Sequence, residues 1–182
     1  MNDLTGESAN LLGAAALLVA GEVREAVAGA VGAGGALGEA LIAIKDQPGR
    51  TADWLAQVLD ISQPGTAHLV RRMTELGWVT RDSNGRARPL RLTAKGKRVA
   101  AAALTARQTV LTTMVNRLTE EQRAQLVTIT GALLGPQAGS EQALAQLCRL
   151  CDRSSCPRCP VHESWQTCRD ATAQGHTRLS SG

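Results

Sequence analysis

The chain has 182 residues, of which 43% are hydrophobic and 20% are charged, so it can bury a core without disulfides and is not disordered as a whole. It has no Phe, no Tyr and only three Trp, which argues against an aromatic-rich β-sandwich and a base-stacking RNA-binding sheet. The net charge is +4, and residues 61–98 alone hold nine basic and two acidic side chains. This concentration is typical of an anion-binding surface.

No secretory signal or membrane span is predicted. The N-terminal segment carries Asp3 and Glu7 and no basic residue before the apolar run, unlike a secretory signal. Charged residues from Glu22 onward interrupt that run too soon for a membrane helix. We therefore expect a cytoplasmic protein without a membrane partner.

Hydrophobic spacing predicts helices throughout the first half of the chain. An Ala/Leu/Val-rich stretch predicts one long helix over 9–31 and a second helix over 36–45. Thr51 is expected to cap a third helix, and Ser62 a fourth that ends at Gly77.

A short basic hairpin is predicted next. The β-type run Trp78–Arg81 is followed by an Asn-Gly turn at Ser83–Gly85 and by a return strand at Leu90–Thr93. Helix, tight turn, helix and basic hairpin together form the plan of a winged helix-turn-helix. The predicted fold class is therefore mainly α with a small β-hairpin wing.

The rest of the chain is predicted to be helical up to a cysteine-rich segment. A long helix is expected over 94–117, and Thr119 with Gln122 forms a capping box for another over 120–134. Residues 135–139 are a predicted linker, and Ser140 is expected to start a short helix.

Polar residues at the start of the fourth helix are suited to the DNA major groove, and arginines are suited to phosphates and the minor groove. We therefore expect double-stranded DNA as a partner. The predicted contacts are Ser62, Gln63, Gly65, Thr66, His68, Arg71 and Arg72 on the helix, with Arg81, Arg86 and Arg88 on the hairpin.

Ordered motifs carry a resemblance to a known family. They are Arg50-Thr51-Ala52-Asp53-Trp54-Leu55-Ala56, Leu59-Asp60-Ile61-Ser62-Gln63-Pro64, Leu69-Val70-Arg71-Arg72-Met73, Gly77-Trp78-Val79-Thr80-Arg81 and Leu90-Arg91-Leu92-Thr93-Ala94-Lys95-Gly96. In this order and spacing they resemble the MarR family of transcriptional regulators, and the resemblance extends over roughly 10–134.

The resemblance implies a homodimeric transcription factor, a repressor rather than an enzyme. It implies that the terminal helices form the dimer interface, that two winged lobes read a near-palindromic operator, and that Arg86 is the wing arginine. It also implies a small-molecule effector. The expected divisions are 1–35 and 97–147 for dimerisation, 36–96 for DNA binding, 148–169 for the cysteine-rich segment and 170–182 for a disordered tail.

The cysteine-rich segment predicts a metal centre. Cys148, Cys151, Cys156 and Cys159 follow a C-x2-C-x4-C-x2-C pattern, and in a reducing compartment such clusters bind metal more often than they form disulfides. Cys168 and His162 are spare candidate ligands. Cys148 and Cys151 are expected on one face of a helix end, with Arg149, Arg153 and Arg158 favouring their thiolates.

The identity of the centre is left open between two metals. Four cysteines in one short segment that ends in Cys-Pro favour an iron–sulfur cluster, whereas zinc is the alternative. The centre can serve as a redox or metal sensor of a regulator. The alternatives are a structural zinc knot in a regulator with an organic inducer, or a cysteine-cluster redox protein.

Overall fold

The structure, a computed structural model, describes residues 3–81, 88–153 and 159–166. It is mostly helical with one two-stranded antiparallel sheet, so the predicted fold class is confirmed. Among the described residues, none of the helices combines the length and the apolar character that a membrane crossing needs.

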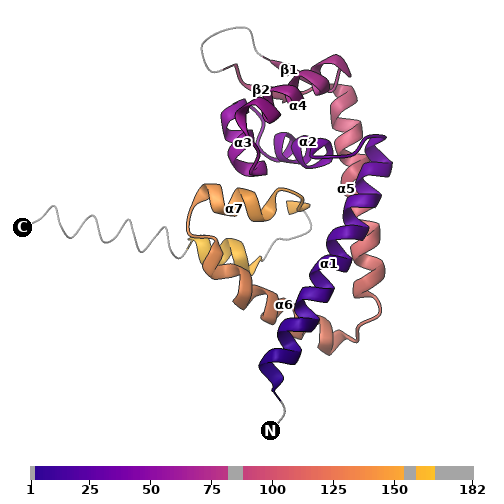
Figure 1. The fold of residues 1–182 in the computed structure, drawn as a ribbon, viewed down its shortest axis with the longest axis vertical. Coiled ribbons are helices and arrows are strands. Elements are labelled where there is room, and N and C mark those ends of the chain that lie inside the picture. The colour runs from indigo at the N-terminus through magenta and orange to yellow at the C-terminus, as the bar shows by residue number, and fades with distance from the viewer. Residues whose placement is uncertain (1–2, 82–87, 154–158, 167–182) are drawn as a thin grey trace, which may run out of the picture.

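Two long helices form the spine of the molecule. Helix α1 spans Leu4–Val31 and packs along α5, which spans Ala94–Val115 (Figure 1). Helix α1 begins five residues before its predicted start, because the Asp3 carboxylate caps it and accepts a hydrogen bond of 3.0 Å from the Gly6 amide. It ends at Gly32, whose φ of 71° is left-handed.

Three shorter helices build the lobe at one end of this spine. They are α2 (Leu37–Asp46), α3 (Ala52–Leu59) and α4 (Gln63–Glu75). The predicted caps are confirmed, since Thr51 accepts from the Trp54 amide at 3.2 Å and Ser62 from the Gly65 amide at 3.2 Å. The main core lies among these helices, the end of α1 and the start of α5; its largest fully buried side chains include Leu37, Leu41, Ile42, Ile44, Leu55, Met73 and Leu90.

The wing follows α4 as a short hairpin. Strand β1 (Val79–Arg81) pairs antiparallel with β2 (Leu90–Leu92), with Val79 opposite Leu92 and Arg81 opposite Leu90. The Gly77 φ of 69° ends α4 ahead of β1, as the sequence predicts. The predicted turn at Ser83–Gly85 lies outside the described residues.

The second half of the chain folds back toward the lobe. Helix α6 (Glu120–Leu134) has the predicted capping box, and the 3₁₀ turn η1 (Gly135–Gln137) connects it to α7 (Glu141–Cys148). The expected linker 135–139 is more ordered than predicted, because Ala138 is buried in a small second cluster. A helical segment over 160–166 was not predicted, and the expected disordered tail 170–182 lies outside the described residues.

The wing and α5 meet at a very close backbone contact. A Cβ atom at Gly96 would lie 2.0 Å from the Trp78 carbonyl oxygen, so only glycine fits there. Thr93 reinforces the contact, since its hydroxyl donates to the Gly77 carbonyl at 2.7 Å and its amide to the Trp78 carbonyl at 2.9 Å. This joint therefore fixes the wing relative to the long helix.

We predict that Gly96→Ala destabilises the fold, because the methyl group would force the Trp78 backbone away. Overpacking of this kind costs about 1–3 kcal/mol or more, which thermal or urea unfolding measures. The matched control is Gly29→Ala, since Gly29 is a helical glycine in α1 with no atom within 4 Å of its added Cβ. The free energy of unfolding of that variant is expected to rise by about 0.5–1 kcal/mol. Equal stability of the two variants would contradict the close contact between Gly96 and the Trp78 backbone.

Candidate DNA-binding surface and cysteine-bearing arm

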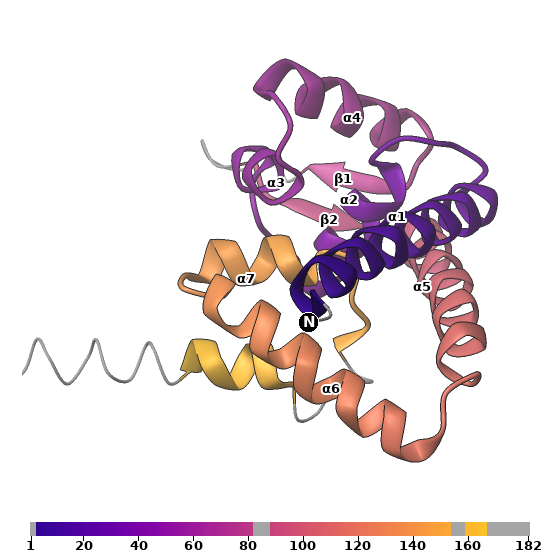
Figure 2. The same cartoon turned by 60° about the horizontal axis from the view of Figure 1, so that its bottom comes forward.

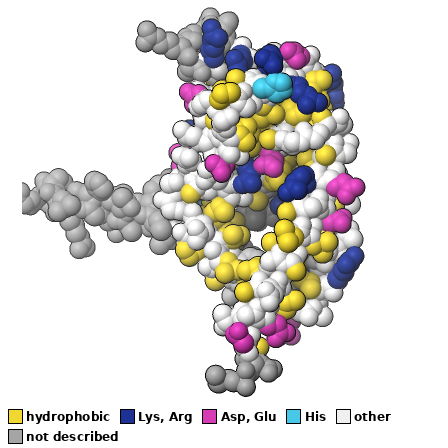
Figure 3. Space-filling model, in the orientation of Figure 1, with side chains coloured by type: hydrophobic (Ala, Val, Ile, Leu, Met, Phe, Trp, Pro, Cys, Tyr) yellow, Lys and Arg dark blue, Asp and Glu magenta, His cyan; other side chains and the backbone are white. Residues whose placement is uncertain are grey.

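Helix α4 presents a polar and basic outer face. The predicted contact residues that are exposed on or just before it are Ser62, Gln63, Gly65, His68, Arg71 and Arg72. Lys and Arg side chains gather over the end of the molecule that holds α4 and the wing (Figure 3). The position of the helix N-terminus on the surface is the one that a recognition helix needs to reach base edges.

Thr66 does not belong to this outer face, which corrects the sequence-based prediction. Its side chain is 0% exposed, and its hydroxyl donates to the Ser62 carbonyl at 3.1 Å. Thr66 thus packs inward with the core of the lobe and cannot touch a base in this structure. The sequence pattern missed this because Thr66 stands among exposed polar neighbours.

Side-chain contacts along α4 orient Arg71. Arg71 Nη2 lies 2.8 Å from His68 Nδ1, and Arg71 Nε lies 3.8 Å from a carboxylate oxygen of Glu75, one turn further along the helix. Both contacts are solvent-exposed and therefore weak. They leave the guanidinium close to the helix surface, where a phosphate can replace Glu75 as its partner.

A surface groove separates α4 from the first strand of the wing. It is lined by Ala67, Arg71, Thr74, Glu75 and Arg81. Arg81 and Arg88 are both exposed, at the two sides of the hairpin where the described residues stop and resume. The predicted wing contact Arg86 lies outside the described residues.

A C-terminal arm, defined here as residues 140–153, docks on the lobe formed by α2, α3 and α4. Helix α7 packs against α3, as the two views of the ribbon also show (Figures 1 and 2). Within the arm, Ala145 joins the main core while Leu144 is buried in the second cluster. The sequence-based division placed 97–147 with the dimerisation helices, whereas α7 packs here on the lobe.

Long-range polar contacts hold the arm in place. Arg149 Nε donates to Glu39 Oε2 of α2 at 2.7 Å, and Arg153 Nη1 to Asp46 Oδ2 at 3.0 Å. Two further contacts link the two ends of α7 to the lobe: Arg50 pairs with Glu141, and Gln146 Nε2 donates to the backbone carbonyl of Gln57 at 2.8 Å. Each partly exposed ion pair contributes little alone, but together they fix the arm against α2 and α3.

The arm brings two of the predicted ligand thiols together. Helix α7 ends at Cys148, so Cys151 is not on the helix as predicted, but its amide donates to the Cys148 carbonyl at 2.8 Å and closes a turn. A side-chain hydrogen bond with Cys148, together with the charges of Arg107 and Arg153, lowers the pKa of Cys151 to about 6, while the interaction with Cys151 and burial raise the pKa of Cys148.

Among the described residues, the other predicted ligands do not complete a metal-binding group with this pair. Cys159 packs in the same apolar cluster as Cys148, but the described residues contain no group of three His, Cys, Asp or Glu side chains placed to hold a metal ion. His162 stacks at a tilt on Trp165, with ring centres 5.6 Å apart. Cys156, Cys168 and Arg158 lie outside the described residues, so the four-thiol centre stays a prediction.

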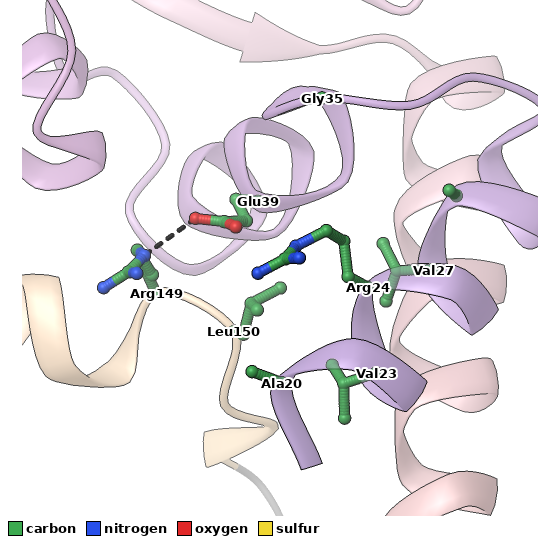
Figure 4. A pocket seen from close by; sticks show the side chains of 9 residues that line it. Ala20, Val23, Arg24, Val27, Gly35, Glu39, Arg149 and Leu150 are labelled. Atoms are coloured by element: carbon green, nitrogen blue, oxygen red, sulfur yellow. Dashed lines mark hydrogen bonds and ion pairs between the residues drawn. The ribbon is translucent and has the colours of Figure 1, made fainter. Parts of the chain in front are cut away.

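A cavity of about 150 Å³ lies between α1, α2 and the arm (Figure 4). Apolar side chains of α1 line one wall, and Leu150 of the arm lines another. The polar residues around it are Arg24, Glu39 and Arg149, of which the last two form the ion pair described above. Sequence reasoning could not locate this pocket, because the arm that closes it is distant in sequence.

The comparisons with known proteins agree with this geometry. A family model described as MarR family matches residues 39–88. The helix-turn-helix segment is of the MarR type. No curated protein matches the chain.

Solved structures of MarR proteins share the fold over most of their length. A MarR family protein from Bacillus stearothermophilus is 23% identical with a TM-score of 0.65, and the match covers 73% of this chain and 95% of that one. YusO from Bacillus subtilis is 21% identical with a TM-score of 0.60, covering 73% and 97%. A MarR family protein from Mycobacterium tuberculosis, solved in complex with DNA, is 22% identical with a TM-score of 0.54, covering 67% and 96%.

These likenesses show that the chain has the fold of MarR-type transcriptional regulators. Nearly all of each neighbour is matched, but roughly a quarter to a third of this chain has no counterpart in them. Function at the level of residues must therefore be argued from this chain's own surface.

Proposed function

We propose that this protein is a homodimeric, sequence-specific DNA-binding transcription regulator that acts as a repressor, and not an enzyme. The observation that carries the proposal is the exposed N-terminal face of α4, beside a basic wing on a MarR-type lobe. One neighbour of this fold was solved with DNA bound. The same use of α4 by this chain is our inference.

Some of the exposed side chains are suited to contact base edges, and others are suited to contact backbone phosphates. Gln63 stands in the first turn of α4, and an amide side chain can pair with the edge of adenine in the major groove. Arg72 lies two turns further on, exposed, and suits a backbone phosphate. Arg81 and Arg88 extend the positive surface to the wing, where shape and phosphates are read rather than bases.

We predict that Gln63→Ala changes the preferred DNA sequence, whereas Arg72→Ala weakens binding to all sequences alike. Loss of a base contact costs about 1–3 kcal/mol of discrimination at one base pair, and loss of a phosphate contact reduces the salt slope of binding by about 1. Duplexes selected from a random pool by the wild-type protein provide the operator, and titrations at several salt concentrations give both quantities.

The control for this experiment is Thr66→Val, which removes a buried hydroxyl of α4. It is expected to lower stability by about 1 kcal/mol and to leave base preference unchanged. The proposal is wrong if the wild-type protein enriches no sequence, or if Gln63→Ala and Arg72→Ala both bind the selected duplex as the wild type does.

The dimer is inferred from apolar surface that one chain leaves uncovered. Helix α6 buries none of its residues, although five large apolar side chains project from it: Leu126, Val127, Ile129, Leu133 and Leu134. The first part of α1 exposes another set: Leu4, Leu11, Leu12, Leu17 and Leu18. Large exposed apolar surfaces are rare on a monomer and typical of an interface, so we infer that a second copy covers these two sets of side chains.

We predict that the double variant Ile129→Asp, Leu133→Asp is monomeric under conditions where the wild type is a dimer. These side chains are 58% and 47% exposed in one chain, and a charge at each would stay unpaired and desolvated in the interface. Light scattering should give 19.1 kDa for the variant and about twice that for the wild type.

Thr128→Asp is the matched control, because helical geometry places Thr128 opposite the centre of the α6 stripe. This variant should remain a dimer. A wild-type protein that is monomeric at micromolar concentration while still binding its operator tightly would refute the dimer.

We further propose a small carboxylate effector for the cavity between α1, α2 and the arm. Its volume of about 150 Å³ is that of engineered cavities that hold benzene, and Arg24 supplies a positive charge at its edge. One neighbour of the same fold was solved with salicylic acid. An aromatic ring with one carboxylate therefore suits the cavity in size and charge.

We predict that salicylate, used as the probe, binds with an affinity that falls at least about tenfold in Arg24→Leu, since a charge-assisted hydrogen bond is lost. Calorimetric titration measures this. Arg117 is an exposed arginine just beyond the far end of α5, and Arg117→Leu should bind salicylate as the wild type does. Equal affinities in all three proteins would show that the cavity is not the binding site.

A further inference from the structure

The second strand of the wing has a backbone partner besides β1. The Leu90 amide donates to the Arg50 carbonyl at 2.9 Å, and the Gly49 amide donates to the Leu90 carbonyl at 2.9 Å. Leu90 therefore directs both of its backbone groups away from β1 and toward the connection between α2 and α3. This connection, residues 47–51, is called the α2–α3 loop below. It supports β2 along the edge opposite β1.

The side chain of Arg50 connects the α2–α3 loop to the C-terminal arm. It forms the ion pair with Glu141, which lies in the first turn of α7, and its Nε donates to Gln47 Oε1 at 2.9 Å. Its guanidinium group also lies over the Trp54 ring, 5.4 Å from the ring centre. In Figure 2, β2 is the strand on the side of the arm. Arg50 thus contacts the arm with its side chain and β2 with its carbonyl.

The arm is fastened by contacts that can open without unfolding the lobe. Helix α7 has eight residues, and a helix of this length is marginal in water without tertiary packing. In each of the three ion pairs that link the arm to the lobe, the two side chains are between 30% and 58% exposed, so each pair is weak. Local opening of such a segment costs less free energy than opening of the core. The arm can therefore detach while the lobe stays folded.

The α2–α3 loop is a segment that responds to loss of this contact. Gly49 has a φ of 90°, a conformation that glycine adopts without strain and that leaves the loop backbone many alternatives. The side-chain contacts of the neighbouring Arg50 restrict these alternatives. When the arm detaches, Arg50 loses Glu141 and keeps only contacts within the lobe.

We propose that the docked arm braces the wing through Arg50, and that release of the arm loosens the wing and weakens DNA binding. The path is contiguous, because it runs from the Glu141 carboxylate through the Arg50 side chain and carbonyl to the Leu90 amide. Arg88 is exposed two residues before Leu90, so movement of β2 displaces a cation of the wing. The part that concerns DNA rests on the proposed function, and the brace itself does not.

Residue-resolved hydrogen exchange of the full chain, followed by NMR, tests the brace without DNA. Glu141→Arg should speed exchange of the Leu90 amide at least about threefold, because an attraction to Arg50 becomes a repulsion of similar size. The double variant Arg50→Glu, Glu141→Arg restores the pair with opposite polarity and should return the rate toward that of the wild type. The matched control is Gln142→Arg, which adds the same charge on another side of α7 and should leave the rate unchanged.

A second variant releases the whole arm. Ala145→Asp places a charge where α7 joins the main core, and it is used where the α7 amides of Glu141→Arg still exchange as in the wild type. Exchange of the Val70 amide, in the buried part of α4, reports on the lobe itself. The brace is overturned if released arms leave the Leu90 rate unchanged, or if the Val70 rate rises by the same factor as the Leu90 rate.

The part played by Arg50 has its own test. Arg50→Met removes the guanidinium group and keeps the carbonyl that accepts from Leu90, so the connection to the arm is already lost in this variant. Adding Ala145→Asp to it should then speed Leu90 exchange by a smaller factor than Ala145→Asp does alone. Equal factors in the two backgrounds would show that the arm acts on the wing by another route and would overturn the role of Arg50.

Titration of the selected operator duplex measures the consequence for DNA binding. Ala145→Asp should lower the affinity at least about twofold, and by a smaller factor when Arg50→Met is already present. Unchanged affinity in a variant whose Leu90 exchange has risen would confine the brace to the lobe and overturn its effect on DNA binding. If the wild-type protein selects no duplex, the proposed function fails, while the exchange rates still decide whether the arm braces the wing.

Discussion

Because the core contains no Phe or Tyr, its elements must pack closely together. The rest of the structure depends on this close packing. Small aliphatic side chains fill space only when the helices that carry them lie near one another. A Cβ at Gly38 would lie 2.2 Å from Val27 Cγ1, and one at Gly96 would lie 2.0 Å from the Trp78 carbonyl oxygen. The first contact joins α1 to α2, and the second joins the wing to α5. The lobe is thus held to both long helices by contacts that only glycine permits.

The same composition explains why one chain leaves part of its apolar surface exposed. The end of α1 contributes Val23, Val27 and Val31 to the core, whereas the leucines of its first half remain exposed. Helix α6 is the extreme case, because none of its residues is buried. The lobe is complete without these surfaces, and their apolar character is the basis of the dimer proposed above. The proposed dimer surface lies on the first half of α1 and on α6, whereas the lobe packs on the end of α1 and the start of α5.

Local signals made much of the fold predictable from sequence. The caps at Thr51, Ser62, Thr119 and Ser140 involve residues three positions apart, and each was predicted and is present. The exposed arginines of α4 and the pairing of Cys148 with Cys151 were likewise predictable from spacing alone. The burial of Thr66 was not, because a single threonine in a polar stretch carries no periodic signal.

Contacts between distant residues were beyond sequence reasoning. Arg149 and Glu39 are 110 positions apart, and Arg153 and Asp46 are 107 apart. Exposed charges at such separations have many possible partners, so no pattern selects one. For the same reason, the sequence assigned residues 140–147 to the dimerisation helices, while in the structure α7 packs on α3. The role of Arg107 beside Cys151 was missed because it lies on α5.

The position of the arm links the cavity to the lobe through one ion pair. Arg149 and Glu39 line the cavity, and the same pair fastens the arm that ends in the thiols. Helix α3, on which the arm packs, is also the helix against which α4 is positioned. In the proposed effector complex, a carboxylate in the cavity would compete with Glu39 for Arg149 and loosen the arm. This signal would reach α4 through α3, which contacts the arm on one side and α4 on the other.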